Sequence, residues 1–136
     1  MPKISIIVAS EKSDKLYPAM ILASTAAVSG WEAELFFTFW GLLALRKGYE
    51  SSGVSFDYRD YGGKLAEAVS SGAIPNWKKM MDQAKATGKL KVYACSTTCD
   101  LFGINEGNLE SFVDGIVGAA YFLGKAKNSD ITLFIS

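Results

Sequence analysis

The sequence predicts an α/β fold: a three-layer sandwich in which a mostly parallel sheet of about five strands lies between helices. Short apolar runs alternate along the chain with helical segments, which is the order that gives parallel sheets. The runs are apolar throughout rather than in alternation, as expected for strands covered on both faces. The 136 residues, 49% apolar and 21% charged, predict a single globular domain over residues 1–136.

The chain begins with a predicted strand and helix. Residues 3–8 (KISIIV) are a β-branched run suited to a buried strand. Residues 15–29 are Ala-rich with apolar side chains on one stripe, which predicts a helix. Ser13 or Asp14 is the expected N-cap, and Gly30 is expected to end the helix in a left-handed conformation.

A second strand and a less regular region follow. Residues 32–40 (EAELFFTFW) predict the strand, and Gly41 interrupts it before LLALRK, which predicts a second helix. Residues 50–72 mix Gly, Ser and charged residues, so we expect a mobile or partner-facing loop with one short helix near residues 64–69.

The second half of the chain repeats the alternation. Asn76 is placed to cap a helix that Gly88 ends, and residues 89–95 (KLKVYAC) predict the third strand. Apolar residues at helical spacing over residues 109–123 predict an amphipathic helix. Residues 131–136 (ITLFIS) predict a closing strand.

Composition limits the possible functions. Fourteen basic and fourteen acidic side chains cancel, so the charge points to neither nucleic acid nor a membrane surface. The N-terminal apolar run is too short for a signal peptide, and no run approaches the roughly 18 to 20 residues of a membrane span. A cytoplasmic protein with reduced cysteines is therefore predicted.

The absence of histidine removes imidazole bases, Cys-His and Ser-His pairs, and histidine zinc sites. Two cysteines alone make a poor zinc site, so no metal is predicted. No G-x-G-x-x-G or phosphate-loop motif is present, and no cofactor is predicted.

Three loops follow the first three predicted strands: residues 8–14 (VASEKSD), 38–42 (TFWGL) and 94–100 (ACSTTCD). The carboxyl ends of parallel strands meet at one edge, where ligands and reactive groups collect. The candidate pocket residues from these loops are Ser10, Thr38, Phe39, Trp40, Gly41, Ser96, Thr97 and Thr98.

Both cysteines lie in the third loop. If Cys95 ends the strand and Ser96 begins a helix, the free amides of that helix favour a thiolate. Lowering a thiol pKa from about 8.5 to about 7 makes roughly half of it thiolate at neutral pH. The alternative is that Cys95 and Cys99 are packing residues, because free cysteine is often buried.

A disulfide between Cys95 and Cys99 is not favoured by geometry. Helical residues four apart have Cβ atoms about 5–6 Å apart, whereas a disulfide needs about 3.5–4.5 Å. The bond requires Cys95 to stay outside the helix, or the first turn to open.

Segments 36–47 (FFTFWGLLALRK), 93–104 (YACSTTCDLFGI) and 133–135 (LFI) resemble the DsrE/DsrF-like sulfur-relay family. The branch concerned has a strand ending in FFTFWGL and a later AC-x-x-S-M-D-x-M-G-I. Order and spacing agree along nearly the whole chain except over residues 50–72. Thr98, Cys99 and Phe102 depart from the motif, where the family has Ser, Met and Met.

The resemblance implies a DsrEFH-like fold of the flavodoxin or Rossmann type that carries sulfur, as a persulfide or a related group, on Cys95. It also implies TusA-like or rhodanese-like partner proteins and assembly into oligomers. The plentiful aromatic and apolar residues likewise favour a homo-oligomer.

Three functions remain open from the sequence. The first is sulfur carriage or sulfurtransferase activity on Cys95. The second is a dithiol redox enzyme of peroxiredoxin-like or reductase type, which would use Cys95 with Cys99 as a second thiol. The third is a non-catalytic module that binds a small anion or nucleotide.

Overall fold

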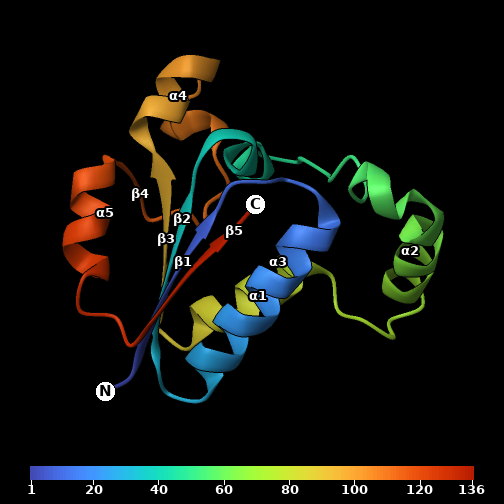
Figure 1. The fold of residues 1–136 in the computed structure, drawn as a ribbon, viewed down its shortest axis with the longest axis horizontal. Coiled ribbons are helices and arrows are strands. Elements are labelled where there is room, and N and C mark those ends of the chain that lie inside the picture. The colour runs from blue at the N-terminus through green and yellow to red at the C-terminus, as the bar shows by residue number, and fades with distance from the viewer.

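Five strands form one parallel sheet in the computed structural model, which describes residues 1–136 (Figure 1). The strands are β1 (Lys3–Val8), β2 (Glu32–Phe37), β3 (Leu90–Cys95), β4 (Gly115–Val117) and β5 (Ile131–Ile135). Their spatial order is β4-β3-β2-β1-β5, and every pairing is parallel. The predicted α/β architecture with about five strands is confirmed.

Helices cover both faces of this sheet. The α-helices are α1 (Ser13–Val28), α2 (Gly62–Ser70), α3 (Trp77–Ala86), α4 (Ser96–Phe102) and α5 (Ala119–Ala126). Three 3-10 helices complete the chain: η1 (Phe39–Leu45), η2 (Phe56–Tyr61) and η3 (Glu106–Asn108). Helices α1 and α3 lie on one face and α5 on the other, while α2 projects away from the sheet (Figure 1). No helix is both long and apolar enough to cross a bilayer.

The two sheet faces are covered unequally. Phe36 of β2 stacks on Phe122 of α5, with ring centroids 4.7 Å apart. Side chains alternate along strands, so Ile7 and Tyr93, which are in register with Phe36, belong to the α5 face. Phe134 continues this row on β5 and is 64% exposed. Helix α5 therefore leaves the β5 side of this face open.

The predicted helix over residues 109–123 is wrong. The chain instead passes through a loop, the short strand β4 and the helix α5. Asp114 interrupts the predicted helix because it pairs with β3. Its carboxylate accepts the backbone N–H of Val92 at 2.7 Å, and its own N–H donates to the Val92 carbonyl. Gly118 then separates β4 from α5. Apolar residues at helical spacing are here shared between a loop, a strand and a helix.

The second predicted strand is too long. It ends at Phe37 rather than at residue 40, and η1 replaces the helix predicted after Gly41. The cause is a left-handed backbone at Phe39, with φ of 47°, which no extended strand accommodates.

Most of the helix ends predicted from capping residues are confirmed. Asn76 caps α3 by accepting the N–H of Lys78, and Gly30 and Gly88 have the left-handed φ values expected beyond α1 and α3. The predicted cap of α1 is wrong, because its N-cap is Lys12 and no side chain caps it. The carboxylate of Asp14 accepts the N–H of Ser55 at 2.8 Å instead.

Helix α2 matches the short helix predicted between residues 50 and 72. Buried Glu11 holds the start of this region in place. Its carboxylate accepts the hydroxyls of Tyr49 at 2.8 Å and Ser52 at 2.7 Å, and the N–H of Ser52 at 3.2 Å. Burial raises the pKa of Glu11, but the bonds from Ser52 and Tyr49 and the charge of Lys12 lower it by more. The net pKa lies below its ordinary value.

We expect Glu11→Gln to lower the free energy of unfolding by about 1–2 kcal/mol at neutral pH, because hydrogen bonds to a charged group are lost. Since the folded-state pKa of Glu11 is depressed, its contribution is present above the unfolded pKa and is lost as the pH falls through the folded pKa. Urea unfolding between about pH 7 and pH 3 should therefore show that the free energy of unfolding falls less steeply with falling pH in the variant than in the wild type. The control is exposed Glu32→Gln. An unchanged slope in Glu11→Gln would contradict the prediction.

Candidate functional site

The loops after β1 and β2 touch at Gly41. A Cβ on Gly41 would lie 2.2 Å from the carbonyl oxygen of Val8 and 3.1 Å from the backbone nitrogen of Ser10. Only glycine allows the backbones to approach this closely. The first two candidate loops are therefore packed together at the carboxyl edge of the sheet.

We expect Gly41→Ala to lower the free energy of unfolding by about 3 kcal/mol, because the added methyl group forces the two backbones apart. Urea unfolding measures the loss. Gly124→Ala is the matched control: it lies in α5 with nothing within 4 Å of an added Cβ, and should be neutral or slightly stabilising. Wild-type stability in Gly41→Ala would show that the contact is not tight.

The third loop joins the second through Thr98. Cys95 ends β3 in an extended conformation and is the N-cap residue of α4. It therefore lies just before the helix, next to the free amides of the first turn. Thr98, fully buried in the first turn, accepts the N–H of Phe39 at 2.9 Å. Its hydroxyl lies 3.3 Å from that of Thr38. The end of β2 and the start of α4 are thus bonded to each other beside the thiol.

These groups favour the ionised form of Cys95. Burial raises the pKa of the thiol, since only 6% of the residue is exposed. Hydrogen bonds to the thiolate from the amide and hydroxyl of Thr98, the hydroxyl of Thr38 and the amide of Thr97 lower the pKa by more. The net pKa lies below its ordinary value, so the site favours an anionic sulfur.

Cys99 has the opposite environment. It is buried in α4, and burial raises its pKa, with the negative charges of Cys95 and Asp100 raising it further. Cys99 is therefore a neutral thiol when Cys95 is ionised. Both cysteines are free in the structure.

An aromatic cluster stands at this edge. Phe39 and Trp40 are each about half exposed and meet edge to face, with ring centroids 5.8 Å apart. The ring centroid of Phe102, one turn beyond Cys99, lies 5.8 Å from that of Trp40. Phe39 is the sole non-glycine residue with positive φ, and such conformations need support from their surroundings. The bond from its N–H to Thr98 provides that support.

Of the remaining predicted residues, Ser10 lies in the loop after β1, and Ser96 and Thr97 begin α4. The hydroxyl of half-buried Ser10 accepts the N–H of Lys12 at 3.2 Å, so it turns toward its own loop. Ser96 is half-buried, and Thr97 is exposed. Gly118 also belongs here, because a Cβ on it would lie 3.8 Å from the hydroxyl of Ser96. Gly118 is not among the predicted site residues, because the wrongly predicted helix over residues 109–123 contains it.

The protein is thus an α/β domain with a polarised thiol at the carboxyl edge of a parallel sheet. A model of the DsrE/DsrF/DrsH-like family matches residues 1–58 and 62–134. The chain belongs to this family. The resemblance found in the FFTFWGL and ACxxS segments is confirmed at the level of the family.

Two curated relatives match almost the full chain. The sulfur carrier protein DsrE2 of Allochromatium vinosum is 32% identical, with 98% of each chain covered. The uncharacterized protein YrkE of Bacillus subtilis is 28% identical, over 98% of this chain and 96% of its own. Among solved structures, the protein of unknown function MTH1491 from Methanobacterium thermoautotrophicum has a TM-score of 0.62 at 12% identity, covering 98% and 99% of the two chains. That likeness shows the fold.

Proposed function

We propose that this chain is a cytoplasmic sulfur carrier that holds sulfur on Cys95 as a persulfide and transfers it to a partner thiol. The observation that carries the proposal is the hydrogen-bonding environment of Cys95, in which Thr98, Thr38 and Thr97 favour the thiolate. Membership of the family and the likeness to a protein named as a sulfur carrier support a sulfur-relay role.

The transfer step requires no external oxidant. The Cys95 thiolate attacks the outer sulfur of a donor persulfide, R–S–SH, and a new S–S bond forms. The donor S–S bond breaks, and its electron pair leaves with the donor as the thiolate R–S⁻. Repetition of the same exchange with an acceptor thiolate releases Cys95 as a thiolate. Sulfur moves between thiols without net oxidation.

The neighbouring residues have separate roles in this proposal. Thr98 and Thr38 donate hydrogen bonds to the anionic sulfur, and Thr97 adds an amide. Phe39, Trp40 and Gly41 form the wall beside it, with Ser10 and Ser96 on the rim.

Partner proteins would dock on the aromatic cluster. Phe39 and Trp40 offer exposed rings next to the thiol, where a TusA-like or rhodanese-like protein could bring its own cysteine. A homo-oligomer would use a different surface, the half-covered sheet face around Phe134. Size-exclusion chromatography with light scattering tests the assembly, and a persistent 14.7 kDa monomer would contradict it.

The structure favours carriage by one thiol over a dithiol redox enzyme. In a dithiol enzyme, the resolving thiol must ionise before it can attack the sulfur held on the first thiol. Both cysteines are buried, but the pKa of Cys99 is raised, by burial and by the charges of Cys95 and Asp100, whereas the pKa of Cys95 is lowered. We therefore assign Cys99 the packing position that methionine has in the family motif.

The direct experiment follows one sulfur atom through a cycle. The protein is incubated with a small persulfide, and its intact mass should rise by one sulfur atom that maps to the Cys95 peptide. Addition of a low-molecular-weight thiol should return the original mass and yield the persulfide of that thiol. Carriage on Cys95 would be rejected if the added sulfur mapped to another residue. It would also be rejected if a reductant reversed the mass gain but a sulfur acceptor did not.

A further inference from the structure

Strand β5 (Ile131–Ile135) forms one edge of the sheet, and its outer side has no partner strand. Its sequence, ITLFI, contains no charged residue, proline or glycine, and its register with β1 is unbroken. Ile131 is 40% exposed and Phe134 is 64% exposed, so the strand is not covered. Proteins normally protect an edge strand with a charge, a proline, a bulge or a covering helix. β5 has none of these protections.

The backbone of β5 offers free hydrogen-bonding groups at this edge. The carbonyl of Ile135 accepts the N–H of Ala9 at 2.9 Å, so the backbone of Ile135 faces β1. Successive residues of a strand direct their backbone groups to opposite edges, so those of Thr132 and Phe134 point outward. Another extended strand satisfies such a row of donors and acceptors, whereas a small ligand does not.

The strand is complementary to a reversed copy of itself. A twofold axis at Leu133 places Thr132 opposite Phe134 of the second copy, in a pair that exchanges both backbone hydrogen bonds. On the other face of the sheet, Leu133 meets its own copy and Ile131 meets Ile135. All these side chains are uncharged, and all but Thr132 are apolar. The pairing therefore brings no like charges together.

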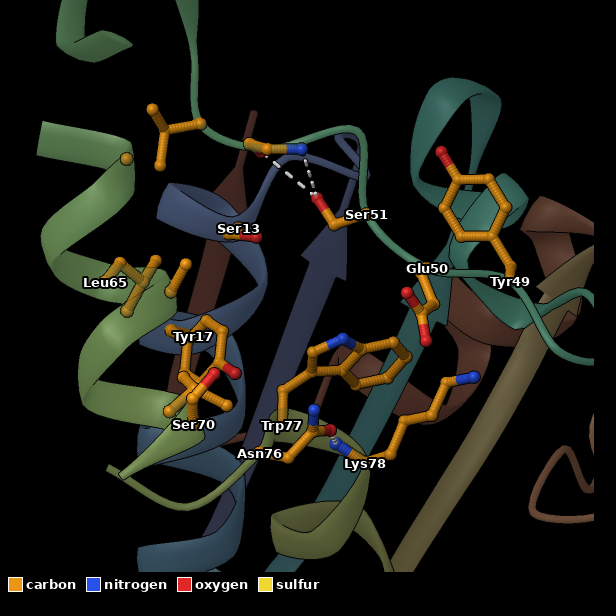
Figure 2. A pocket seen from close by; sticks show the side chains of 15 residues that line it. Ser13, Tyr17, Tyr49, Glu50, Ser51, Leu65, Ser70, Asn76, Trp77 and Lys78 are labelled. Atoms are coloured by element: carbon orange, nitrogen blue, oxygen red, sulfur yellow. Dashed lines mark hydrogen bonds between the residues drawn. The ribbon is translucent and has the colours of Figure 1, made fainter. Parts of the chain in front are cut away.

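A helix beside this edge also exposes an uncharged surface. Helix α1 packs against β1, the neighbour of β5, and has no charged side chain after Lys15. Helix α2 faces Ser13 and Tyr17 of α1 across a cavity (Figure 2), which leaves Ile21 and Val28 exposed. A second copy therefore approaches the edge without meeting a charged surface of α1.

Two further features favour a contact between identical strands. Asp130, which precedes β5, turns its carboxylate to the N–H of Lys3 at 2.9 Å, away from the free edge. The opposite edge of the sheet, β4, has only three residues, all half-buried, and does not match β5 in length. Head-to-tail pairing of β5 with β4 of another copy is therefore disfavoured, whereas a twofold contact closes on itself.

We infer that β5 is the contact strand of a twofold dimer, in which the sheets of two copies join through antiparallel β5 strands. The inference rests on the homo-oligomer of the proposed function and identifies its contact. β5 contributes no residue to the cysteine site, so breaking the contact should leave sulfur loading on Cys95 unchanged. Failure of the contact and failure of sulfur carriage are thus distinguishable.

Cysteine cross-linking tests the register directly. Leu133→Cys is made in a Cys95→Ser, Cys99→Ala background, so that the new thiol has no competitor. The axis holds the two Cβ atoms at this position about 4.5–5.5 Å apart, so mild oxidation should link most chains into pairs. Ile135→Cys is the matched control, since its two copies would lie about 13 Å apart along the strands. Equal linking of both variants, or none in Leu133→Cys, would overturn the pairing.

Thr132→Pro removes an outward N–H while the bonds to β1 remain, so the sheet should still form. Light scattering at about 100 μM should show a dimer, or a larger assembly with an even number of chains, for the wild type. Thr132→Pro should reduce this mass to half or less. Phe134→Lys, at an exposed side chain, should have the same effect and replaces the proline if that variant does not fold. A wild-type mass of 14.7 kDa, or an assembly that both variants leave intact, would overturn β5 as the contact.

Discussion

Cys95→Ser should reduce sulfur loading from a small persulfide to background, because a serine hydroxyl is not ionised at neutral pH and cannot replace the thiolate. The change removes the atom that forms the new S–S bond, so no smaller effect is compatible with carriage on Cys95. Intact-mass measurement over a time course gives the loaded fraction directly. Among the expected effects, this loss is the largest.

Cys99→Ala is the matched control for Cys95→Ser. The Cys99 thiol is buried and has a raised pKa, so its removal should leave the loaded fraction close to that of the wild type. Cys99→Met, which restores the residue of the family motif, should behave in the same way. Equal loading of Cys95→Ser and wild type would refute the proposed function. Loss of loading in both Cys99 variants would instead support the dithiol mechanism.

Thr98→Val should raise the pKa of Cys95, because the isosteric side chain no longer donates a hydrogen bond to the thiolate. Each unit of rise in the pKa lowers the thiolate fraction, and hence the alkylation rate at neutral pH, by at most about tenfold. The rate of iodoacetamide alkylation against pH gives the pKa as the midpoint of its rise. We expect the midpoint to lie below the ordinary thiol value in the wild type and to move to higher pH in Thr98→Val.

Thr98→Ser keeps the hydroxyl and should retain a midpoint near that of the wild type. This comparison separates electrostatics from simple damage to the fold. Thr98→Val also leaves the N–H of Phe39 without its acceptor, which costs about 1–3 kcal/mol of stability, and urea unfolding measures that loss independently. An unchanged alkylation midpoint in a folded Thr98→Val protein would show that this hydroxyl does not act on the sulfur.

The sequence predicts the sheet because its strands are short apolar runs with clear boundaries. It also places Cys95 correctly at the end of β3, since the apolar run stops there and α4 begins at Ser96. Convergence of the three loops follows from parallel topology alone, and the contacts of Gly41 with Val8 and of Phe39 with Thr98 agree with it. These features depend on local pattern and on one general rule of α/β folds.

Other features depend on partners far away in the sequence. Thr38 and Thr98 are 60 positions apart, and nothing in either segment signals their contact. The left-handed conformation of Phe39 is supported by the bond from its N–H to Thr98, so local propensity gives no warning that β2 ends early. The error over residues 109–123 has a similar origin, because Asp114 bonds to β3 and breaks a pattern that is otherwise helical.

The position of β1 has a consequence for synthesis on the ribosome. β1 pairs with β2 on one side and with β5 on the other. One edge of the first strand therefore stays unpaired while everything between Val8 and Ile131 is being translated. An open apolar edge is a template for aggregation, so nascent chains of this protein should depend on chaperones until β5 emerges.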